Sequence, residues 1–258
     1  TLARLGRTAA FAGVVGDDAA GRMIADGLRR ERVGVDGLVR RAGFRSPVSV
    51  ILVENGRRAI IEHAQYGLPL AFDELERAGV GFDDCRTLLI DARLVAVQLE
   101  AARRVRRAGG HVVLDCGHPR PGVDELLSLT DVAIFSYTYA EAMLGASYDA
   151  RVFLEAVAGR LPPDGPRIAG LTLGPAGCAI YAPQSGFARI GGHAVDAVDP
   201  TGAGDVFHGA FVHAHLAGRA PEQAARFANA AAALKCTAMT GRAVLPDEQA
   251  IWQLALGR

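Results

Sequence analysis

The sequence predicts an α/β protein built on a mainly parallel sheet with helices on both faces. Its 258 residues and 50% hydrophobic content are enough for one large domain with a substantial core. From residue 87 onward, short apolar runs alternate with helical patterns. These runs are apolar at consecutive positions, which is typical of strands that are buried on both faces of a parallel sheet.

The first part of the chain has a different pattern. An apolar run over residues 8–15 predicts a buried strand, and a helix follows that begins after Asp17 and Asp18, a residue type that caps helix N-termini. Between residues 45 and 63, two β-prone runs flank Asn55-Gly56. Because Asn-Gly favours a tight hairpin turn, we expect a small two-stranded β element here.

The strands expected in the second part are residues 87–91, 111–115, 131–135 and 168–173, with a helix over 95–107. Parallel sheets of this kind bind their ligands at the carboxyl ends of the strands. The residues that directly follow each apolar run are therefore candidates for a binding site.

The residues of 199–205 form the most informative motif, Asp-Pro-Thr-Gly-Ala-Gly-Asp, and an apolar helix follows it. At such a helix start, the N–H groups of Gly202, Ala203 and Gly204 are uncovered by side chains, and the helix dipole favours an anion such as a phosphate. A carboxylate at Asp205 would repel a resting phosphate. It is well placed, however, to take a proton from a hydroxyl that attacks one.

With this motif the chain resembles the ribokinase-like (PfkB) family of carbohydrate kinases, whose signature is Asp-Thr-Thr-Gly-Ala-Gly-Asp; here only Pro200 departs from it. The resemblance extends from Gly13 to Thr237, and the segments around His208 and Lys235 look closest to the sulfofructose kinase-like branch. It implies a three-layer α/β/α sandwich with a small β lid. The family also has a strand and part of the sugar site before the position of Thr1, so we expect an N-terminal segment to be missing.

The implied organisation is a single kinase domain over residues 1–258, with lid strands at about 45–66 and a nucleotide-binding half at about 168–258. In the family, the turn that here contains Thr172, Gly174 and Gly177 lies against the nucleotide phosphates. On the residues alone, a structural turn is the better interpretation of this glycine-rich stretch.

Three further positions have roles by resemblance. Asn229 matches a position that lines the adenine pocket, in a helix whose small residues would also serve close packing. Asp199 and Thr201 match the residues that shape a potassium site behind the anion hole. The implied ligands are therefore ATP, Mg²⁺ and K⁺.

The family pattern fails at one place. Many relatives have an Asn-x-x-Glu motif that organises magnesium-bound water, and the matching positions are Ser136 and Tyr139. We therefore expect Mg²⁺ to arrive with ATP, since the triphosphate supplies most of its ligands.

Arg93 gives an indication of the substrate. It follows the run 87–91, and in ribokinases the matching position is a glutamate that accepts hydrogen bonds from sugar hydroxyls. An arginine only donates, in a fork that suits carboxylate, sulfonate or phosphate groups. If the lid closes, Glu62 on its returning strand would pair with Arg93 and leave a pocket for a neutral ketose. We expect a hexose- or ketose-type sugar or a sugar acid rather than ribose.

Composition restricts the partners. A formal net charge of zero and a pI near 7 give no sign of a basic surface that would bind nucleic acid or an anionic membrane. The four cysteines form no CxxC pair, which suits a reducing cytoplasm, and no apolar run approaches the roughly 20 residues that span a bilayer. We expect a sugar and ATP as partners, and a homodimer formed through the lid.

The function predicted from the sequence is transfer of the γ-phosphoryl group of ATP to a sugar hydroxyl. A nucleoside kinase of the same fold is the alternative among enzymes. A non-catalytic sugar or nucleotide sensor is the alternative outside them, because an anion hole binds phosphate without turnover. Asp205 argues against a sensor, since a neutral residue would serve binding better.

Overall fold

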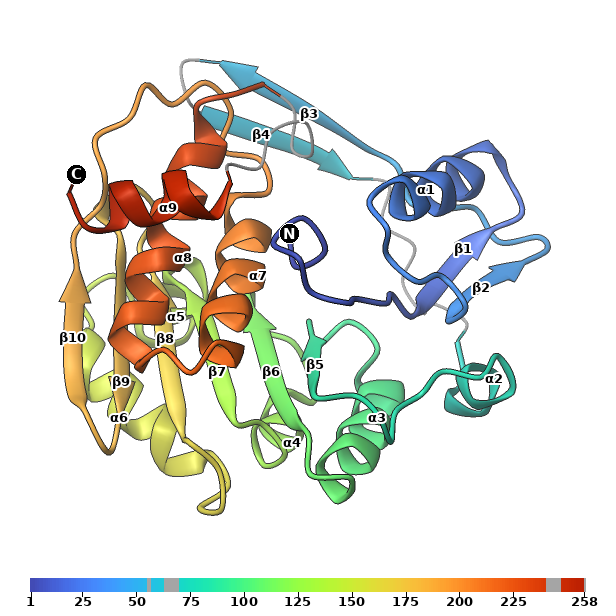
Figure 1. Cartoon of the computed structure of the whole chain (residues 1–258), viewed down its shortest axis with the longest axis horizontal. Helices are drawn as coiled ribbons and strands as arrows, with labels where there is room; N and C mark the ends of the chain where they lie inside the picture. Colours follow the sequence, from blue (N-terminus) through green and yellow to red (C-terminus); the bar gives the residue numbers. More distant parts are fainter. Residues whose placement is uncertain (55–56, 63–69, 240–246, 258) are drawn as a thin grey trace.

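The computed structural model describes residues 1–54, 57–62, 70–239 and 247–257 (Figure 1). Their largest sheet has the strand order β10-β9-β8-β7-β6-β5. The strands from β5 to β8 are parallel, and β9 and β10 are antiparallel additions at one edge. Their bounds are β5 Thr87–Ile90, β6 His111–Cys116, β7 Val132–Ser136, β8 Ile168–Thr172, β9 Cys178–Ala182 and β10 Gly186–Ile190. The mainly parallel sheet expected from the sequence is confirmed.

Helices cover both faces of this sheet. The first layer contains α3 (Val95–Arg107), α4 (Val123–Leu127), α5 (Tyr137–Leu144) and α6 (Ala150–Arg160), and the second contains α7 (Ala203–Leu216), α8 (Pro221–Cys236) and α9 (Glu248–Ala255). Adjacent residues of one strand face opposite layers: Ile134 packs toward α7 and α8, and Phe135 packs toward α5 and α6. Consecutive apolar residues are therefore buried throughout each strand.

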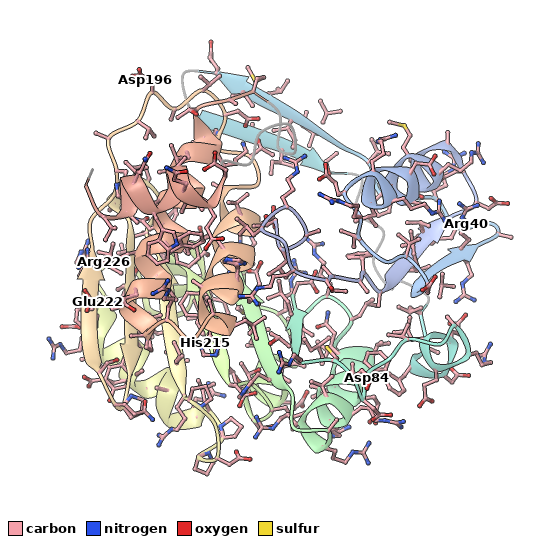
Figure 2. The ribbon with its side chains drawn as sticks, viewed as in Figure 1. Arg40, Asp84, Asp196, His215, Glu222 and Arg226 are labelled. Atoms are coloured by element: carbon pink, nitrogen blue, oxygen red, sulfur yellow. The ribbon has the colours of Figure 1, made fainter. Side chains whose placement is uncertain are left out.

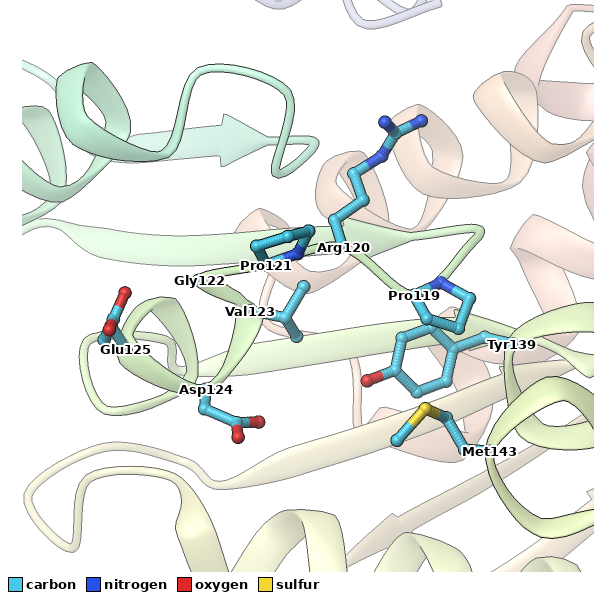
Figure 3. A pocket seen from close by; sticks show the side chains of 9 residues that line it. All are labelled: Pro119, Arg120, Pro121, Gly122, Val123, Asp124, Glu125, Tyr139 and Met143. Atoms are coloured by element: carbon cyan, nitrogen blue, oxygen red, sulfur yellow. The ribbon is translucent and has the colours of Figure 1, made fainter.

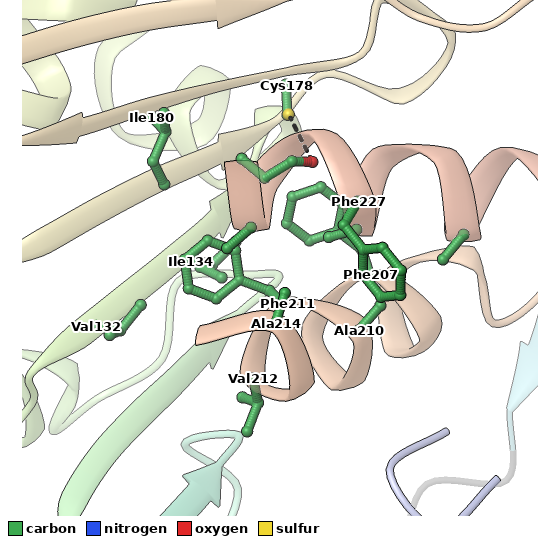
Figure 4. Close-up of a cluster of buried hydrophobic side chains, with 14 of the residues drawn as sticks. Val132, Ile134, Cys178, Ile180, Phe207, Ala210, Phe211, Val212, Ala214 and Phe227 are labelled. Carbon is green, nitrogen blue, oxygen red and sulfur yellow. Dashed lines mark hydrogen bonds between the residues drawn. The ribbon is translucent and has the colours of Figure 1, made fainter. Parts of the chain in front are cut away.

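Three phenylalanines anchor α7 and α8 to the sheet and to each other (Figure 4). Phe207 and Phe211 lie on α7 and Phe227 lies on α8, and all three are almost completely buried. Fully burying a side chain of this size contributes about 1.5–3 kcal/mol. Small neighbours such as Ala210 and Ala228 let the two helices approach closely. This packing fixes the direction of α7, whose first turn carries Asp205.

A smaller βαβ unit precedes the main sheet. Strand β1 (Gly13–Gly16) is parallel to β2 (Leu38–Arg41), and α1 (Ala19–Arg30) connects them. The predicted strand over residues 8–15 is wrong in its first half: residues 10–12 are exposed, and only an isolated bridge joins Ala10 to Gly34. The apolar run there consists largely of alanine, which has little β-propensity and little area to bury.

Asp18 forms the N-cap of α1, as the sequence suggested. Its Oδ1 accepts the N–H of Gly21 at 2.7 Å, and its Oδ2 accepts the N–H of Ser46 at 2.8 Å. These hydrogen bonds hold the pKa of Asp18 below its ordinary value. The cap therefore also ties α1 to the segment that leads into the hairpin.

The expected hairpin is confirmed by β3 (Ser49–Glu54) and β4 (Arg57–Glu62), which pair antiparallel with Ser49 opposite Glu62. The turn residues Asn55 and Gly56 lie outside the described residues. The hairpin projects from the β1–β2 unit and crosses above α7 in the view of Figure 1. Val50, Leu52 and Ile61 share one face of the hairpin and are more than half exposed, and Ile51 and Ile60 on the other face are 38% and 50% exposed.

Charged side chains lie mostly at the surface, as Figure 2 shows, and some of them pair with a neighbour on the same helix. Glu222 and Arg226, one turn apart on α8, form such a pair at 2.7 Å. Short α2 (Phe72–Arg77) contributes another between Asp73 and Arg77. Among the described residues, no helix is both long and apolar enough to cross a bilayer.

Candidate active site

The motif at residues 199–205 forms the start of α7, as expected. Gly202 is the N-cap and has φ 78°, a left-handed conformation that glycine adopts without strain. Gly204 is exposed, and a Cβ added to it would meet no atom within 4 Å. The N–H groups in the first turn of a helix have no acceptor within the helix. One of these groups has an acceptor outside the helix: the N–H of Ala203 donates to the carbonyl of Pro200 at 3.2 Å.

Asp205 is exposed in this first turn and lies near a cluster of charged groups from other elements. One member of the cluster is Asp115, near the end of β6. Burial raises the pKa of Asp115, His208 opposes the rise, and the negative charges of Asp205 and Asp91 add to it. The carboxyl ends of β5 and β6 and the first turns of α7 therefore meet at one place.

His208 and Asp115 are in contact within this cluster, with 3.3 Å between Nε2 and Oδ1. The other ring nitrogen of His208 lies 2.7 Å from the carbonyl oxygen of Gly204. Our sequence analysis assigned no role to either residue. The helical spacing of three between Asp205 and His208 was the available signal, since it places both on one face of α7.

The neighbouring Cys116 has no catalytic character. Burial raises the pKa of its thiol to about 12, so it is protonated at neutral pH. Its thiol donates a long hydrogen bond to the carbonyl oxygen of nearby His118, at 3.9 Å.

The expected nucleotide residues are brought together by a tight backbone contact. Gly174 begins a single turn, Gly174–Ala176, and Gly177 follows it with φ 91°. A Cβ on Gly177 would lie 2.1 Å from the carbonyl oxygen of Ile190, so only glycine fits there. Asn229 of α8 is buried and donates to the carbonyl of Gly191 at 2.9 Å. Asn229 thus holds the chain segment against which the Gly177 turn packs.

Thr172 ends β8, and its hydroxyl donates to the carbonyl of Phe135 at 3.3 Å. Its side chain is half-buried at the carboxyl edge of the sheet. Ser136, at the end of the adjacent β7, caps α5 and donates to the carbonyl of Gly117 at 2.6 Å. The position of the missing Asn-x-x-Glu motif therefore has a structural role here.

Arg93 is exposed just after β5, where the sequence placed it. The preceding residue, Ala92, is buried with φ 58°, so the backbone turns sharply as it leaves the strand. Arg93 Nε lies 3.6 Å from Asp91 Oδ2, and its N–H donates to the same carboxylate at 3.0 Å. The side chain of Glu62 lies outside the described residues, so the expected pairing of Glu62 with Arg93 stays a prediction.

A cationic side chain, Lys235, already lies beside Asp199, the residue that the resemblance assigned to a potassium site. Lys235 Nζ donates to the carbonyl of Asp199 at 2.7 Å and lies 3.9 Å from its Oδ2. The other carboxylate oxygen accepts the N–H of Thr201 at 2.8 Å. Two unit charges of the same sign 4 Å apart repel by about 4 kcal/mol at an effective dielectric constant of 20. Although the buried Thr201 hydroxyl has no hydrogen-bond partner among the residues that the structure describes, the residues here fit a second cation poorly.

In the described part of the chain, no group of three or more His, Cys, Asp or Glu side chains is arranged to hold a metal such as magnesium. The residues are therefore consistent with a metal that is held mainly by nucleotide phosphates.

A hollow of about 400 Å³ lies beside the site, after β6. It is lined by residues 119–125, Tyr139 and Met143. The side chain of Arg120 extends away from those of Tyr139 and Met143 (Figure 3). None of the residues discussed above as phosphate or sugar contacts lines it.

Known proteins resemble the chain along most of its length. The family model described as "pfkB family carbohydrate kinase" matches residues 1–248. A ribokinase of Haemophilus influenzae is 29% identical over 96% of this chain and 81% of its own length. Fructokinase-1 of Oryza sativa subsp. japonica is 30% identical over 98% of this chain and 84% of its own.

The structural comparison agrees. A putative ribokinase II from E. coli, solved in complex with ATP and Mg²⁺, has a TM-score of 0.81 and 20% identity, covering 100% of this chain and 86% of that one. This likeness shows a shared fold, the ribokinase-like α/β sandwich.

Proposed function

The chain belongs to the pfkB family of carbohydrate kinases, and we propose that it transfers the γ-phosphoryl group of ATP to a hydroxyl of a hexose- or ketose-type sugar or sugar acid. The observation that carries this proposal is the exposed Asp205 carboxylate in the first turn of α7, directly after the glycine-bounded helix start. A base and an anion site are thus adjacent on one turn of helix.

In this proposal Asp205 accepts the proton of the attacking hydroxyl. General base catalysis of this kind contributes about 10²–10⁴ to the rate. The N–H groups of Gly202, Ala203 and Gly204 face the charge that develops on the transferred group, and the α7 dipole adds to their effect. Since the N–H of Ala203 also has an acceptor in Pro200, Gly204 contributes most. Bound Mg²⁺ would neutralise charge on the ATP phosphates.

The nucleotide would lie along the turn that contains Thr172, Gly174 and Gly177. Asn229 supports it from behind by fixing Gly191. The solved neighbour with ATP and Mg²⁺ supports the choice of both ligands, since the two chains share a fold. Thr172 and the cluster around Asp205 lie at the carboxyl edge of the sheet, where ligands of such folds bind.

The sugar side of the site contains Arg93, Asp91 and Asp115 near Asp205. A carboxylate accepts hydrogen bonds from hydroxyls and an arginine donates them, so the group suits a polyhydroxylated acceptor. Ribokinases and fructokinases are both among the relatives. A nucleoside kinase remains the second candidate, whereas Asp205 argues against a sensor.

We also propose a cytoplasmic location and a homodimer. Cys85, Cys116 and Cys178 are free thiols, which suits a reducing compartment. The exposed apolar side chains on both faces of the β3–β4 hairpin are suited to burial, one face over the sugar and the other against a second lid.

The test is ATP consumption by the purified protein with ribose, fructose, sugar acids and nucleosides as acceptors. Asp205→Asn should bind ATP normally and lose about 10²–10⁴ in kcat. Asp84→Asn, an exposed aspartate outside the site, is the matched control and should behave as wild type. An Asp205→Asn enzyme that keeps more than half of the activity would remove Asp205 from the reaction.

A further inference from the structure

Lys235 is the only lysine of the chain, and it is also one of its most deeply buried side chains, at 1% exposure. All other basic positions that are not histidine are arginine, and they lie mainly at the surface. A buried ammonium group is costly unless it is paired, so an apolar residue would fill this space more cheaply. Stability alone therefore does not explain why a lysine lies here, and its charge indicates a functional role.

We propose that the Lys235 ammonium group permanently takes the place of a monovalent cation behind the anion hole, so that the kinase works without potassium. This inference rests on the proposed function. Lys235 is then a positioning residue: it acts on the phosphoryl group through Asp199 and the start of α7.

The contacts connect Lys235 to the anion hole in short steps. Its Nζ donates to the Asp199 carbonyl at 2.7 Å, and the next residue, Cys236, accepts the N–H groups of Val198 and Asp199 at 2.8 and 3.1 Å. The end of α8 thus holds this segment by three hydrogen bonds. The Asp199 carboxylate in turn accepts the N–H of Thr201 at 2.8 Å, directly before Gly202.

The chemistry of the site explains why the lysine would substitute for a metal ion. Potassium is held by carbonyl and carboxylate oxygens, and Asp199 offers both of these to Lys235. A free ion must bind and can dissociate, whereas a side chain cannot leave. Like a bound ion, the ammonium places positive charge behind the N–H groups that receive the phosphoryl group.

The first experiment compares potassium chloride with tetramethylammonium chloride at equal ionic strength, since the tetramethylammonium ion is too large for such a site. Wild-type kcat should be the same in both salts, and so should its melting temperature. Lys235→Met should lose at least about tenfold in kcat, by analogy with other losses of charge stabilisation, with a smaller change in KM for ATP. Potassium ions should restore part of this loss, because methionine is one heavy atom shorter than lysine and leaves the position of the ammonium group open.

Arg226→Met, which removes an exposed positive charge from the same helix, is the matched control and should keep wild-type kinetics in both salts. Activation of the wild type by potassium would overturn the proposal, and so would wild-type kcat in Lys235→Met. A folded but slow Lys235→Met that no small cation rescues would also overturn it, since that result would indicate a structural role alone.

Two measurements keep the inference separate from the proposed function. If Lys235→Met does not fold, the melting temperature of the wild type still decides: a rise specific to potassium would show an open cation site and contradict the proposal. If no acceptor is phosphorylated, the proposed function fails, but the melting temperature of Lys235→Met still tests the cation. It should rise with potassium and not with tetramethylammonium, and equal values in both salts would overturn the proposal.

Discussion

His208 lies between a carbonyl oxygen and a carboxylate: Nδ1 is 2.7 Å from Gly204 O, and Nε2 is 3.3 Å from Asp115 Oδ1. Because a carbonyl oxygen only accepts, Nδ1 carries a hydrogen. The contact between Nε2 and the carboxyl group of Asp115 is then favourable only if a hydrogen lies between them, bonded either to the ring nitrogen or to the carboxyl oxygen. Burial raises the pKa of Asp115, and His208 opposes this rise.

The two contacts of His208 can be separated by substitution. His208→Asn keeps an amide N–H at the position of Nδ1 and removes the partner of Asp115, so both stability and kcat/KM should fall. Adding Asp115→Asn should recover part of the lost stability, with a coupling of about 0.5–3 kcal/mol in a double-mutant cycle measured by urea unfolding. Strictly additive effects would show that the pair does not interact.

The raised pKa of Asp115 predicts a pH dependence of stability. The groups that act on it are His208, Asp205, Asp91 and Arg93. The folded protein keeps this proton at pH values where the unfolded chain has released it, so the stabilisation is complete below the ordinary pKa of 3.8 and is lost as pH rises through the folded pKa. Asp115→Asn should lack this loss, so its stability relative to wild type should increase with pH. A difference that is constant between pH 4 and 8 would contradict the raised pKa.

Gly202 and Gly204 should respond differently to the same substitution. Gly202→Ala places a Cβ at φ 78° and should destabilise the fold by about 1 kcal/mol. Gly204→Ala lies in a helical turn with open space around it, so the melting temperature should stay or rise slightly. Its methyl group would nevertheless obstruct an anion, and kcat should fall. Full activity in a folded Gly204→Ala enzyme would remove this N–H group from phosphoryl stabilisation.

The sequence predicted the elements whose signal is local. Helix α3 has the predicted bounds, and β3 and β4 pair antiparallel as the β-prone runs predicted. The strand over residues 8–15 was half wrong because hydropathy alone cannot separate an alanine-rich coil from a strand.

Within the site, the motif gave the position of Asp205 and of the left-handed Gly202. It could not give the contacts of His208 with Asp115 or of Lys235 with Asp199, each of which joins residues from two elements. These contacts depend on how α7 and α8 pack on the sheet and on each other. The hydrophobic periodicity of each helix does not say which of its residues contact which residues of another element. The role of Asn229 in holding Gly191 was hidden for the same reason.

Arg93 provides the test of the substrate class. The guanidinium group is about half exposed at the carboxyl edge of β5, and Asp91 is close enough to orient it without enclosing it. An exposed pair of this kind contributes little to stability, so Arg93→Glu should fold normally. The rigid fork of an arginine suits a carboxylate or sulfonate on the substrate, and a glutamate would repel such groups and accept hydrogen bonds from hydroxyls.

We therefore expect Arg93→Glu to lower kcat/KM for a keto-sugar acid or a sulfonated ketose by about tenfold or more, and to lower it less for fructose or ribose. Arg103→Glu, which reverses an exposed charge on α3, is the control for the general change in charge and should leave the preference unaltered. If Glu62 neutralises Arg93 when the lid closes, fructose will instead be the best substrate of the wild type, and Glu62→Gln will shift the preference toward the acids. Steady-state kinetics on these four acceptors decide between the two arrangements, and ribose as the best wild-type substrate, or an unchanged preference in Arg93→Glu, would contradict both.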